Sequence, residues 1–547
     1  MRLFFKAFYC QFGIMCSMKL RPQDTETQPE KPESIMAQMA VLLSEKDDII
    51  EQKIDVIAQQ KKRIAMLEEH LRLSHSKRFG PSSEQTPPEQ GNLFNEAEAL
   101  AEPEQAPLPL SETDETKGKK GRKPLSDKLP RHQVFAYLTE EEKVDAIDTF
   151  FVKVREELDI IPAQVRVLEY MQEKATFKTQ DGGRTIKVAQ LIKHPVPKAM
   201  GSVNLMTYVI ISKYADGMPL YRLENIIKRY GGEISRATLA NWVIALSKQA
   251  QPLINLLRES QHSGPLVCAD ETRIQVLKEP GRSPTSDKWM WVTLGGLPQQ
   301  QSVLFDYDPS RAREVPLRLL DGFTDGYLQT DGYAGYNEVC KQNNLIHVGC
   351  WDHARRKFRE AKDGQPKDMK GKVTRADMAL SFINKLYVIE RQIKSLTVAE
   401  IYQARQQKSV PILNQLNKWL AQQRPRVDKG GLTGKAMTYL HNQWEKLMVY
   451  STDGQLRLSN ILAENAVRPF AVGRRAWLFA DTPAGANASA IHYSLIETAK
   501  CHKLEPYAYL NAVFKALPYA DTVEKIEDLL PWNFKKTTPN WLPTQVH

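Results

Sequence analysis

The feature that most constrains this chain is a series of short apolar runs between residues 265 and 351. The first three runs follow one another at hairpin distances, which predicts three consecutive antiparallel strands. The fourth and fifth runs each follow a helical pattern, the first of which covers residues 311–320. The five runs are Leu266–Asp270, Trp289–Leu294, Ser302–Tyr307, Tyr327–Asp331 and Leu345–Trp351. We therefore expect a mixed α/β domain with three antiparallel strands, a helix, a strand, a helix and a strand.

Two of the predicted strands end in an aspartate. Asp270 closes the first run, and Asp331, followed by Gly332, closes the fourth. The predicted order of elements is that of a ribonuclease-H-like fold, in which the first and fourth strands are neighbours. Paired carboxylates at such a position suit divalent ions that stabilise the attacking and leaving oxygens of a phosphodiester. Glu271 adjoins Asp270 but should point to the opposite face of the strand.

A third acid is available on a predicted helix. Asn460, Glu464 and Arg468 are spaced by four residues, so they line one helical face. An amide, an acid and a guanidinium on that face would serve a metal site and a nearby phosphate. Taken alone, Glu464 is better explained as an exposed helix acid paired with Arg468.

Several motifs of the region from about 265 to 512 resemble the insertion-sequence-66 family of bacterial DDE transposases. The motifs are Ala269-Asp-Glu-Thr272, Leu328-Gln-Thr-Asp-Gly-Tyr-Ala-Gly-Tyr-Asn337, Cys350-Trp-Asp-His-Ala-Arg-Arg-Lys-Phe358, Asn460-Ile-Leu-Ala-Glu-Asn-Ala-Val-Arg-Pro469 and Gly473-Arg-Arg-Ala-Trp-Leu-Phe479. Upstream, the resemblance continues through Pro219-Leu-Tyr-Arg222, Glu157-Leu-Asp-Ile-Ile-Pro-Ala163, Leu129-Pro-Arg131 and Phe79-Gly-Pro-Ser-Ser-Glu84. It therefore covers most of the chain beyond the first residues.

The resemblance implies a DNA transposase of an insertion sequence. Asp270, Asp331 and Glu464 would bind two Mg²⁺ ions, with Mn²⁺ as a possible substitute, and cleavage at the element ends would free a 3′-OH for strand transfer into target DNA. The residues expected to face DNA in this region are His353, Arg355, Arg356, Asn460, Arg468, Arg474 and Arg475. Two rivals remain: a structure-selective nuclease of the same fold, and a non-catalytic DNA-binding regulator or decayed transposase.

The N-terminal part of the chain reads as a leader, a helix and a linker. Residues 1–34 are expected to be a disordered leader, 35–75 a coiled-coil helix and 76–127 a flexible linker. Leu43, Ile50, Ile57, Ile64 and Leu71 recur every seven residues, which favours self-association, although packing against another part of the chain remains open. In the linker, a basic run containing Arg122 and Lys123 is either a minor-groove contact or a solvated charge run.

Two further units precede the acidic segment. Residues 128–198 should form a small α+β unit, and 199–262 a helical unit in which Gly231-Gly232 separates two helices and Ser235 caps the second. The pair resembles a helix-turn-helix, with Arg236 and Asn241 as candidate DNA contacts, or is a simple helical hairpin. Residues 263–500 would be the catalytic domain, with a helical insertion over about 360–455, and 501–547 a C-terminal tail.

Metal-ligand counting gives no reason to expect zinc. Members of the resembled family commonly carry a cysteine-rich zinc segment, but residues 128–198 contain no cysteine. Cys350 and His353 form a lone Cys-x-x-His pair, whereas a tetrahedral structural zinc needs about four ligands.

The composition agrees with a nucleic-acid partner in a reducing compartment. The formal net charge is +10, the six cysteines form no CxxC pair, and no run approaches the length of a membrane span. We expect a cytoplasmic, nucleoid-associated protein that binds element ends and target DNA, forms a homo-oligomer, has no membrane partner and works with or without accessory proteins of the element.

Overall fold

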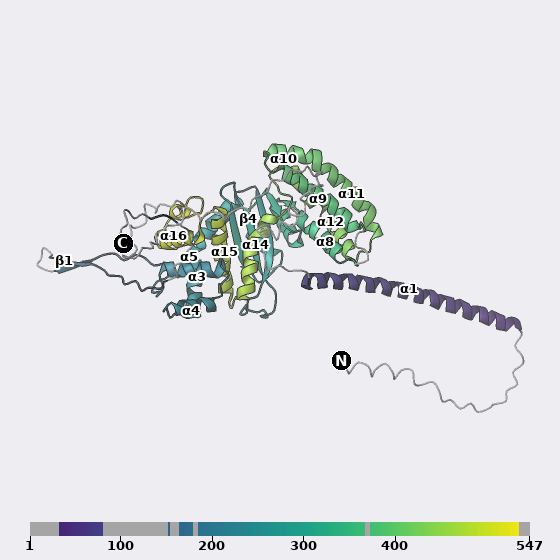
Figure 1. Cartoon of the computed structure of the whole chain (residues 1–547), viewed down its shortest axis with the longest axis horizontal. Coiled ribbons are helices and arrows are strands. Elements are labelled where there is room, and N and C mark those ends of the chain that lie inside the picture. The colour runs from purple at the N-terminus through teal and green to yellow at the C-terminus, as the bar shows by residue number, and fades with distance from the viewer. Residues whose placement is uncertain (1–31, 80–150, 154–163, 179–183, 367–371, 535–547) are drawn as a thin grey trace, which may run out of the picture. The chain divides into compact units, whose positions relative to one another are not determined.

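The computed structural model describes residues 32–79, 151–153, 164–178, 184–366 and 372–534 (Figure 1). They belong to two compact units, residues 1–78 and 79–547, which are described separately. The predictions for 1–31 and for 80–127, including Arg122 and Lys123, lie outside the described residues. In the part of the chain that is described, no helix is long and apolar enough to cross a membrane.

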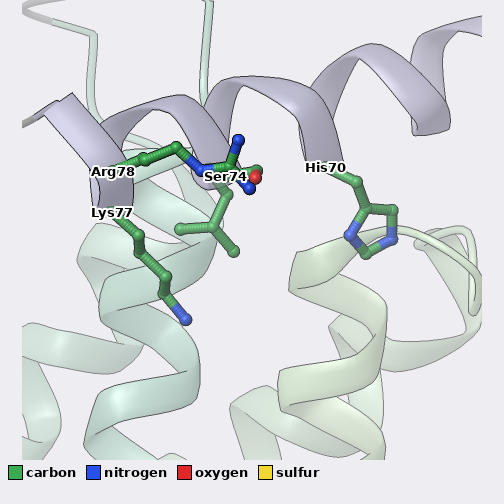
Figure 2. A pocket seen from close by; sticks show the side chains of 5 residues that line it. His70, Ser74, Lys77 and Arg78 are labelled. Atoms are coloured by element: carbon green, nitrogen blue, oxygen red, sulfur yellow. The ribbon is translucent and has the colours of Figure 1, made fainter.

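The first unit contains one long helix, α1 (Pro32–Phe79), where the sequence predicted a helix over 36–74. The heptad residues face solvent, from Ile57 at 50% exposed to Leu71 at 70%. An apolar column left exposed at this spacing is what a coiled coil requires, so self-association through α1 stays a prediction. Near the C-terminal end of α1, a hollow is lined by His70, Leu73, Ser74, Lys77 and Arg78 (Figure 2).

The predicted α+β unit over 128–198 is described only in part. Its described residues include two strands, β1 (Lys174–Lys178) and β2 (Arg184–Val188), which pair antiparallel. The side chains of β2 are exposed. Residues 128–150, 154–163 and 179–183 lie outside the described part.

A five-stranded sheet of order β5-β4-β3-β6-β7 forms the centre of the second unit. The strands are β3 (Leu266–Ile274), β4 (Lys288–Gly295), β5 (Ser302–Asp308), β6 (Tyr327–Gln329) and β7 (Ile346–Val348). The β3–β4 and β4–β5 pairs are antiparallel, whereas β3–β6 and β6–β7 are parallel. Helix α6 (Glu314–Leu319) follows β5, and α7 (Asn337–Gln342) lies between β6 and β7. The predicted succession of strands and helices is therefore present.

Both faces of the sheet are buried because residues of β3 alternate between two apolar cores. Cys268 and Ile274 belong to the larger core. This core also contains side chains from helices that precede β3 in the sequence and from helices that follow β7. Val267 and Ala269 belong to the smaller core, which α6 and α7 cover with Leu319 and Val339 among others. This alternation is the expected two-residue period of a strand buried on both faces.

The larger core includes segments that the sequence assigned to separate parts. Helices α3 (Val203–Tyr214), α4 (Leu220–Arg229) and α5 (Arg236–His262) share it with α14 (Ile461–Trp477), α15 (Pro483–Cys501) and α16 (Pro506–Ala516). Ser235 caps α5 as predicted, accepting a hydrogen bond from the Thr238 amide. However, α5 extends to His262 and packs on the sheet. In the expected C-terminal tail, Leu510 and Phe514 are fully buried. A single apolar core thus crosses the boundaries predicted at 262 and 501.

The predicted insertion is helical. Its described residues, 360–366 and 372–455, include the end of α8 (Trp351–Asp363), α9 (Arg375–Ile393), α10 (Val398–Ala404), the π-helical turn η4 (Arg405–Ser409), α11 (Val410–Gln423), α12 (Leu432–Asn442) and α13 (Trp444–Met448). Figure 1 shows them gathered at one end of the sheet. The amide of Gly349, just after the edge strand β7, donates to the carbonyl of Lys446 in α13 at 2.8 Å, which ties the insertion to the sheet.

His492 on α15 predicts a pH-dependent stability. It is fully buried, and its Nε2 lies 2.8 Å from the carbonyl oxygen of Val243. Burial lowers the pKa of His492 from 6.5 to about 4. As the pH falls, His492 is protonated in the unfolded chain before it is protonated in the folded protein. The free energy of unfolding therefore has its full value above about pH 6.5 and falls by about 3 kcal/mol as the pH approaches 4. His492→Gln keeps a donor for Val243 and should flatten the fall in urea-unfolding free energy between these pH values; parallel curves would contradict the assignment.

Candidate active site

Asp270 and Asp331 lie at equivalent positions just beyond the paired segments of two parallel neighbouring strands, β3 and β6. The β3–β6 pairing ends at Cys268 opposite Gln329, and each aspartate comes two residues after its member of that pair. The fourth strand ends at Gln329, so the prediction that it extends to Asp331 was wrong by two residues. Because parallel strands run in the same direction, both carboxylates reach the same end of the sheet.

The backbone around each aspartate holds its carboxylate. The amide of Glu271 donates to Asp270 Oδ1 at 2.9 Å, and the amide of Tyr333 donates to Asp331 Oδ1 at 2.8 Å. Gly332 between Asp331 and Tyr333 has φ +88°, a left-handed conformation that favours glycine. The hydroxyl of Tyr439, on insertion helix α12, donates to the carbonyl oxygen of Asp331 at 2.6 Å. The insertion therefore supports the loop that carries the second acid.

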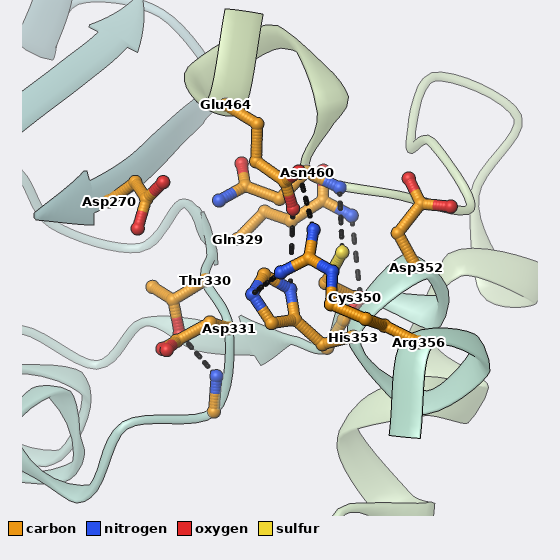
Figure 3. A network of polar contacts seen from close by, with 12 residues as sticks. Asp270, Gln329, Thr330, Asp331, Cys350, Asp352, His353, Arg356, Asn460 and Glu464 are labelled. Carbon is orange, nitrogen blue, oxygen red and sulfur yellow. Dashed lines mark hydrogen bonds and ion pairs between the residues drawn. The ribbon is translucent and has the colours of Figure 1, made fainter. Parts of the chain in front are cut away.

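Glu464 comes from the first turn of α14 and faces the same space (Figure 3). Ala463, Val467 and Phe470 of α14 pack into the larger core, which fixes the helix against β3. The side chain of Glu464 is 3% exposed. This contradicts the alternative in which Glu464 is an exposed acid of a solvated helix.

Asn460, predicted to contact DNA, is instead buried at the start of α14. It is 0% exposed, and its Nδ2 donates to the carbonyl oxygen of Ala269 on β3 at 2.9 Å. Its backbone amide donates to Cys350 Sγ at 3.2 Å. The DNA-contact prediction for Asn460 was therefore wrong, because its amide group joins the helix to the strand beside Asp270.

The three acids influence one another electrostatically. Burial, together with the charges of Glu271, Glu464 and Asp331, raises the pKa of Asp270 well above its usual range. Burial also raises the pKa of Glu464 to about 7, against the opposing effect of Arg356. A cluster of buried carboxylates with so little compensation is a site at which a cation binds favourably.

Helix α8 presents a cation and an imidazole to Glu464. Arg356 Nη2 lies 3.1 Å from Glu464 Oε2, and His353 Nδ1 lies 3.3 Å from Glu464 Oε1 (Figure 3). That second distance would suit an ion pair, but burial and the nearby Arg356 lower the pKa of His353 to about 4, so the imidazole is neutral at pH 7. His353 and Arg356, both predicted to face DNA, thus contact the third acid.

Arg355, also predicted to face DNA, is turned into the protein. It is 6% exposed, and its Nε donates to Asn384 Oδ1 on α9 at 3.1 Å. The prediction was wrong because neighbouring residues of a helix point in different directions, so Arg355 and Arg356 do not share a face.

The remaining predicted DNA contacts fall in two places. Arg474 and Arg475, at the end of α14, line a hollow of about 560 Å³ together with Arg273 of β3. Arg475 is exposed, whereas Arg474 Nη1 donates to the carbonyl oxygen of Arg273. Arg468 is half-buried on the same helix. Arg236 and Asn241 are exposed on the first turns of α5.

Sequence reasoning missed two sets of contacts. Glu271 lies across β3 from Asp270, as predicted, but there it is buried and accepts from the Tyr336 hydroxyl at 2.7 Å and from Arg311. Cys350, His353 and Glu464 place their ligand atoms within 4.8 Å of one another, and within the described residues neither aspartate belongs to that group. Only the lone Cys-x-x-His spacing pointed to this second set.

Comparisons with known proteins agree along the chain. Residues 198–488 match the family described as "Transposase IS66 family", 494–532 match the "IS66 C-terminal element", and 66–134 match "Transposase C of IS166 homeodomain". The chain is 30% identical to the uncharacterized protein y4qI of Sinorhizobium fredii over 393 residues, which is 70% of this chain and 71% of that protein. It is 28% identical to the uncharacterized protein y4jD of the same organism over 399 residues, 70% of this chain and 75% of that protein.

These matches define the chain as a transposase. More particularly, it belongs to the IS66 transposase family, as the match over residues 198–488 and the similarity to y4qI show.

Proposed function

We propose that this chain is a DDE transposase with a ribonuclease-H-like core, in which Asp270, Asp331 and Glu464 form the catalytic acid triad. The observation that carries the proposal is that Asp270 and Asp331 each come two residues after the last residue pair of β3 and β6, while Glu464 reaches the same end of the sheet from α14. The strand order β5-β4-β3-β6-β7, with the acids beside the central strand, supports the assignment of the core.

The residues at this position fit a pair of hard divalent cations. All three donors are carboxylates, the ligands that Mg²⁺ and Mn²⁺ prefer, and burial raises the pKa of Asp270 and Glu464. Two Mg²⁺ ions held there would stabilise the attacking and leaving oxygens of a phosphodiester. No redox or covalent protein intermediate is needed for cleavage at an element end or for transfer of the resulting 3′-OH to target DNA.

The surrounding residues position the triad, and one of them partly compensates the charge of Glu464. Asn460 fixes the start of α14 against β3, and Tyr439 supports the Asp331 loop. Arg356 pairs with Glu464, so its guanidinium is close enough to hold a phosphate oxygen beside the acids.

In the same proposal, the DNA backbone runs along the arginines at the end of α14 and along the start of α5. Arg273, Arg474 and Arg475 line one hollow, and α5 offers Arg236 and Asn241. Arg122 and Lys123 of the linker remain candidate minor-groove contacts. The homeodomain match over 66–134 and the net charge of +10 favour DNA as the partner, and the exposed heptad column of α1 favours a homo-oligomer.

Replacing Arg475 by alanine should weaken DNA binding in a salt-dependent way. One lost phosphate contact lowers the slope of log affinity against log salt by about 0.9. Fluorescence anisotropy over a salt series with a fixed duplex measures this slope. Arg313, an exposed arginine paired with Glu314, provides the matched control, and Arg313→Ala should leave the slope unchanged. Equal slopes for Arg475→Ala and the native protein would remove Arg475 from the interface.

The function is tested with DNA that carries the element's own ends. Native protein with Mg²⁺ should cleave at the end and join the freed 3′-OH to a target duplex, while Asp331→Asn and Glu464→Gln should do neither. Glu314→Gln, a change of an exposed acid, is the matched control and should keep both steps. Cleavage without joining would favour a structure-selective nuclease, and DNA binding without cleavage would favour a regulator or decayed transposase.

A further inference from the structure

We propose that Cys350, His353 and Glu464 form a zinc site that shares Glu464 with the acid triad. Zinc binding stands on the geometry of these three residues alone. Its consequence for the two aspartates rests on the function proposed above.

The spacing of the three ligand atoms fits one zinc ion. Cys350 Sγ, a ring nitrogen of His353 and a carboxylate oxygen of Glu464 all lie within 4.8 Å of one another. Tetrahedral zinc with N and O ligands at about 2.0–2.1 Å separates those two ligand atoms by about 3.3 Å. His353 Nδ1 and Glu464 Oε1 are 3.3 Å apart, so this pair already stands at the distance that zinc requires.

The same two atoms lack hydrogen-bond partners. His353 Nδ1 and Glu464 Oε1 are both buried, both without a hydrogen bond and directed at each other (Figure 3). Buried polar atoms are nearly always satisfied, so a facing pair without partners points to an ion bound between them. The other atoms of these side chains are used: Glu464 Oε2 binds Arg356, which leaves Oε1 for a metal.

The chemistry of the ligands selects zinc over magnesium. A thiolate, an imidazole and a carboxylate suit a borderline-soft ion, whereas Mg²⁺ prefers oxygen ligands. The amide of Asn460 donates to Cys350 Sγ at 3.2 Å and would stabilise the thiolate. On binding, Zn²⁺ replaces the thiol proton of Cys350, which passes to solvent, and His353 binds as the neutral imidazole. Three protein ligands leave a fourth position for water.

Occupation of this site competes with the acid triad. Glu464 Oε1 cannot bind zinc next to Cys350 and His353 and at the same time complete a site with Asp270 and Asp331. Zinc therefore withdraws the third acid and lowers the affinity of the remaining pair for Mg²⁺ or Mn²⁺. The site makes the enzyme sensitive to inhibition by zinc.

Cobalt provides a direct measure of the zinc site on the full chain. Co²⁺ bound to Cys350 should give a thiolate-to-metal charge-transfer band and tetrahedral ligand-field bands, which stoichiometric Zn²⁺ abolishes. Cys350→Ser should remove the charge-transfer band, and His353→Gln should weaken Zn²⁺ binding at least roughly tenfold in a chelator competition. Cys501 is an exposed free cysteine outside the cluster, so Cys501→Ser is the matched control and should change neither result.

Two outcomes would overturn the zinc site. One is a charge-transfer band that persists in Cys350→Ser, and the other is a Zn²⁺ affinity unchanged by His353→Gln. Because Cys350 is fully buried, far-ultraviolet circular dichroism must show that its variant is folded; His353→Gln, at a side chain 20% exposed, tests the site independently.

Competition with Mn²⁺ separates the zinc site from the function on which its consequence rests. Electron paramagnetic resonance of free Mn²⁺ should show that one equivalent of Zn²⁺ reduces Mn²⁺ binding to the native chain. Mn²⁺ binding that is insensitive to Zn²⁺ would refute the competition. Mn²⁺ binding that is insensitive to Asp270→Asn would refute the triad instead and leave the zinc site standing.

Discussion

Asp270→Asn is expected to lower Mg²⁺-dependent cleavage of element-end DNA by at least about 10³-fold while raising the melting temperature of the metal-free protein at pH 7.5. Asparagine keeps the acceptor for the Glu271 amide and cannot ionise. Burial and the charges of Glu271, Glu464 and Asp331 raise the pKa of Asp270, so its charged form destabilises the fold. For a carboxyl whose pKa is raised, that destabilisation grows as pH rises above the unfolded value of about 3.9.

The difference in melting temperature between Asp270→Asn and the native protein should therefore vanish near pH 4. Added Mg²⁺ should raise the melting temperature of the native protein but not that of the variant. Asp306→Asn is a control in which the stability of the metal-free protein should change in the opposite direction. Asp306 on β5, which is separated from β3 by β4, accepts a hydrogen bond from Arg258 at 2.8 Å, so its replacement should reduce stability and leave cleavage intact. A variant at Asp270 that is inactive but also less stable than the native protein would indicate a collapsed site rather than a missing ligand.

Asn460→Ala is expected to reduce cleavage by about 10²-fold through displacement of Glu464. The variant loses the hydrogen bond from Nδ2 to the carbonyl oxygen of Ala269, which costs about 1–3 kcal/mol of stability in a buried position. Since that bond sets the distance between α14 and β3, its loss should also weaken Mn²⁺ binding. A residue that only stabilises the fold would not change the metal affinity of the folded protein.

Asn465→Ala supplies the comparison for Asn460, because Asn465 is exposed on the same helix one residue after Glu464. It should change neither Mn²⁺ affinity nor cleavage. If Asn460→Ala loses stability yet binds Mn²⁺ as tightly as the native protein, Asn460 has no positioning role.

The sheet could be predicted from sequence because strands leave a local signature. Apolar runs of strand length, separated by turns and helical patterns, gave all five strands of the large sheet and the two aspartates. The end of β6 was misjudged because the sequence does not mark the point, Gln329, at which pairing with β3 stops. The core that α5 and the C-terminal helices share with the sheet crosses the boundaries predicted at 262 and 501, because the burial of these helices depends on residues far away in the sequence.

The direction of individual side chains could not be predicted. Asn460 is a residue type that often contacts DNA. However, it lies where the start of α14 meets β3, and its side-chain amide donates to the carbonyl oxygen of Ala269. Arg355 and Arg356 are indistinguishable in sequence, yet one binds Asn384 inside the insertion and the other binds Glu464. Likewise, a lone Cys-x-x-His gives no zinc site until folding brings Glu464, from far along the chain, to within reach.

The hydrogen bond from Tyr439 to the Asp331 carbonyl has a consequence for efforts to miniaturise such enzymes. Helices α9 to α13 look like an insertion that could be removed, since they lie between the second and third acids in the sequence and at one end of the sheet. They instead support the active-site loop, because the side chains of Tyr439 and Gln443 donate hydrogen bonds to the carbonyl oxygens of Asp331 and Gly332. Trimming this region to shorten the gene would leave an intact sheet whose second aspartate has lost its scaffold.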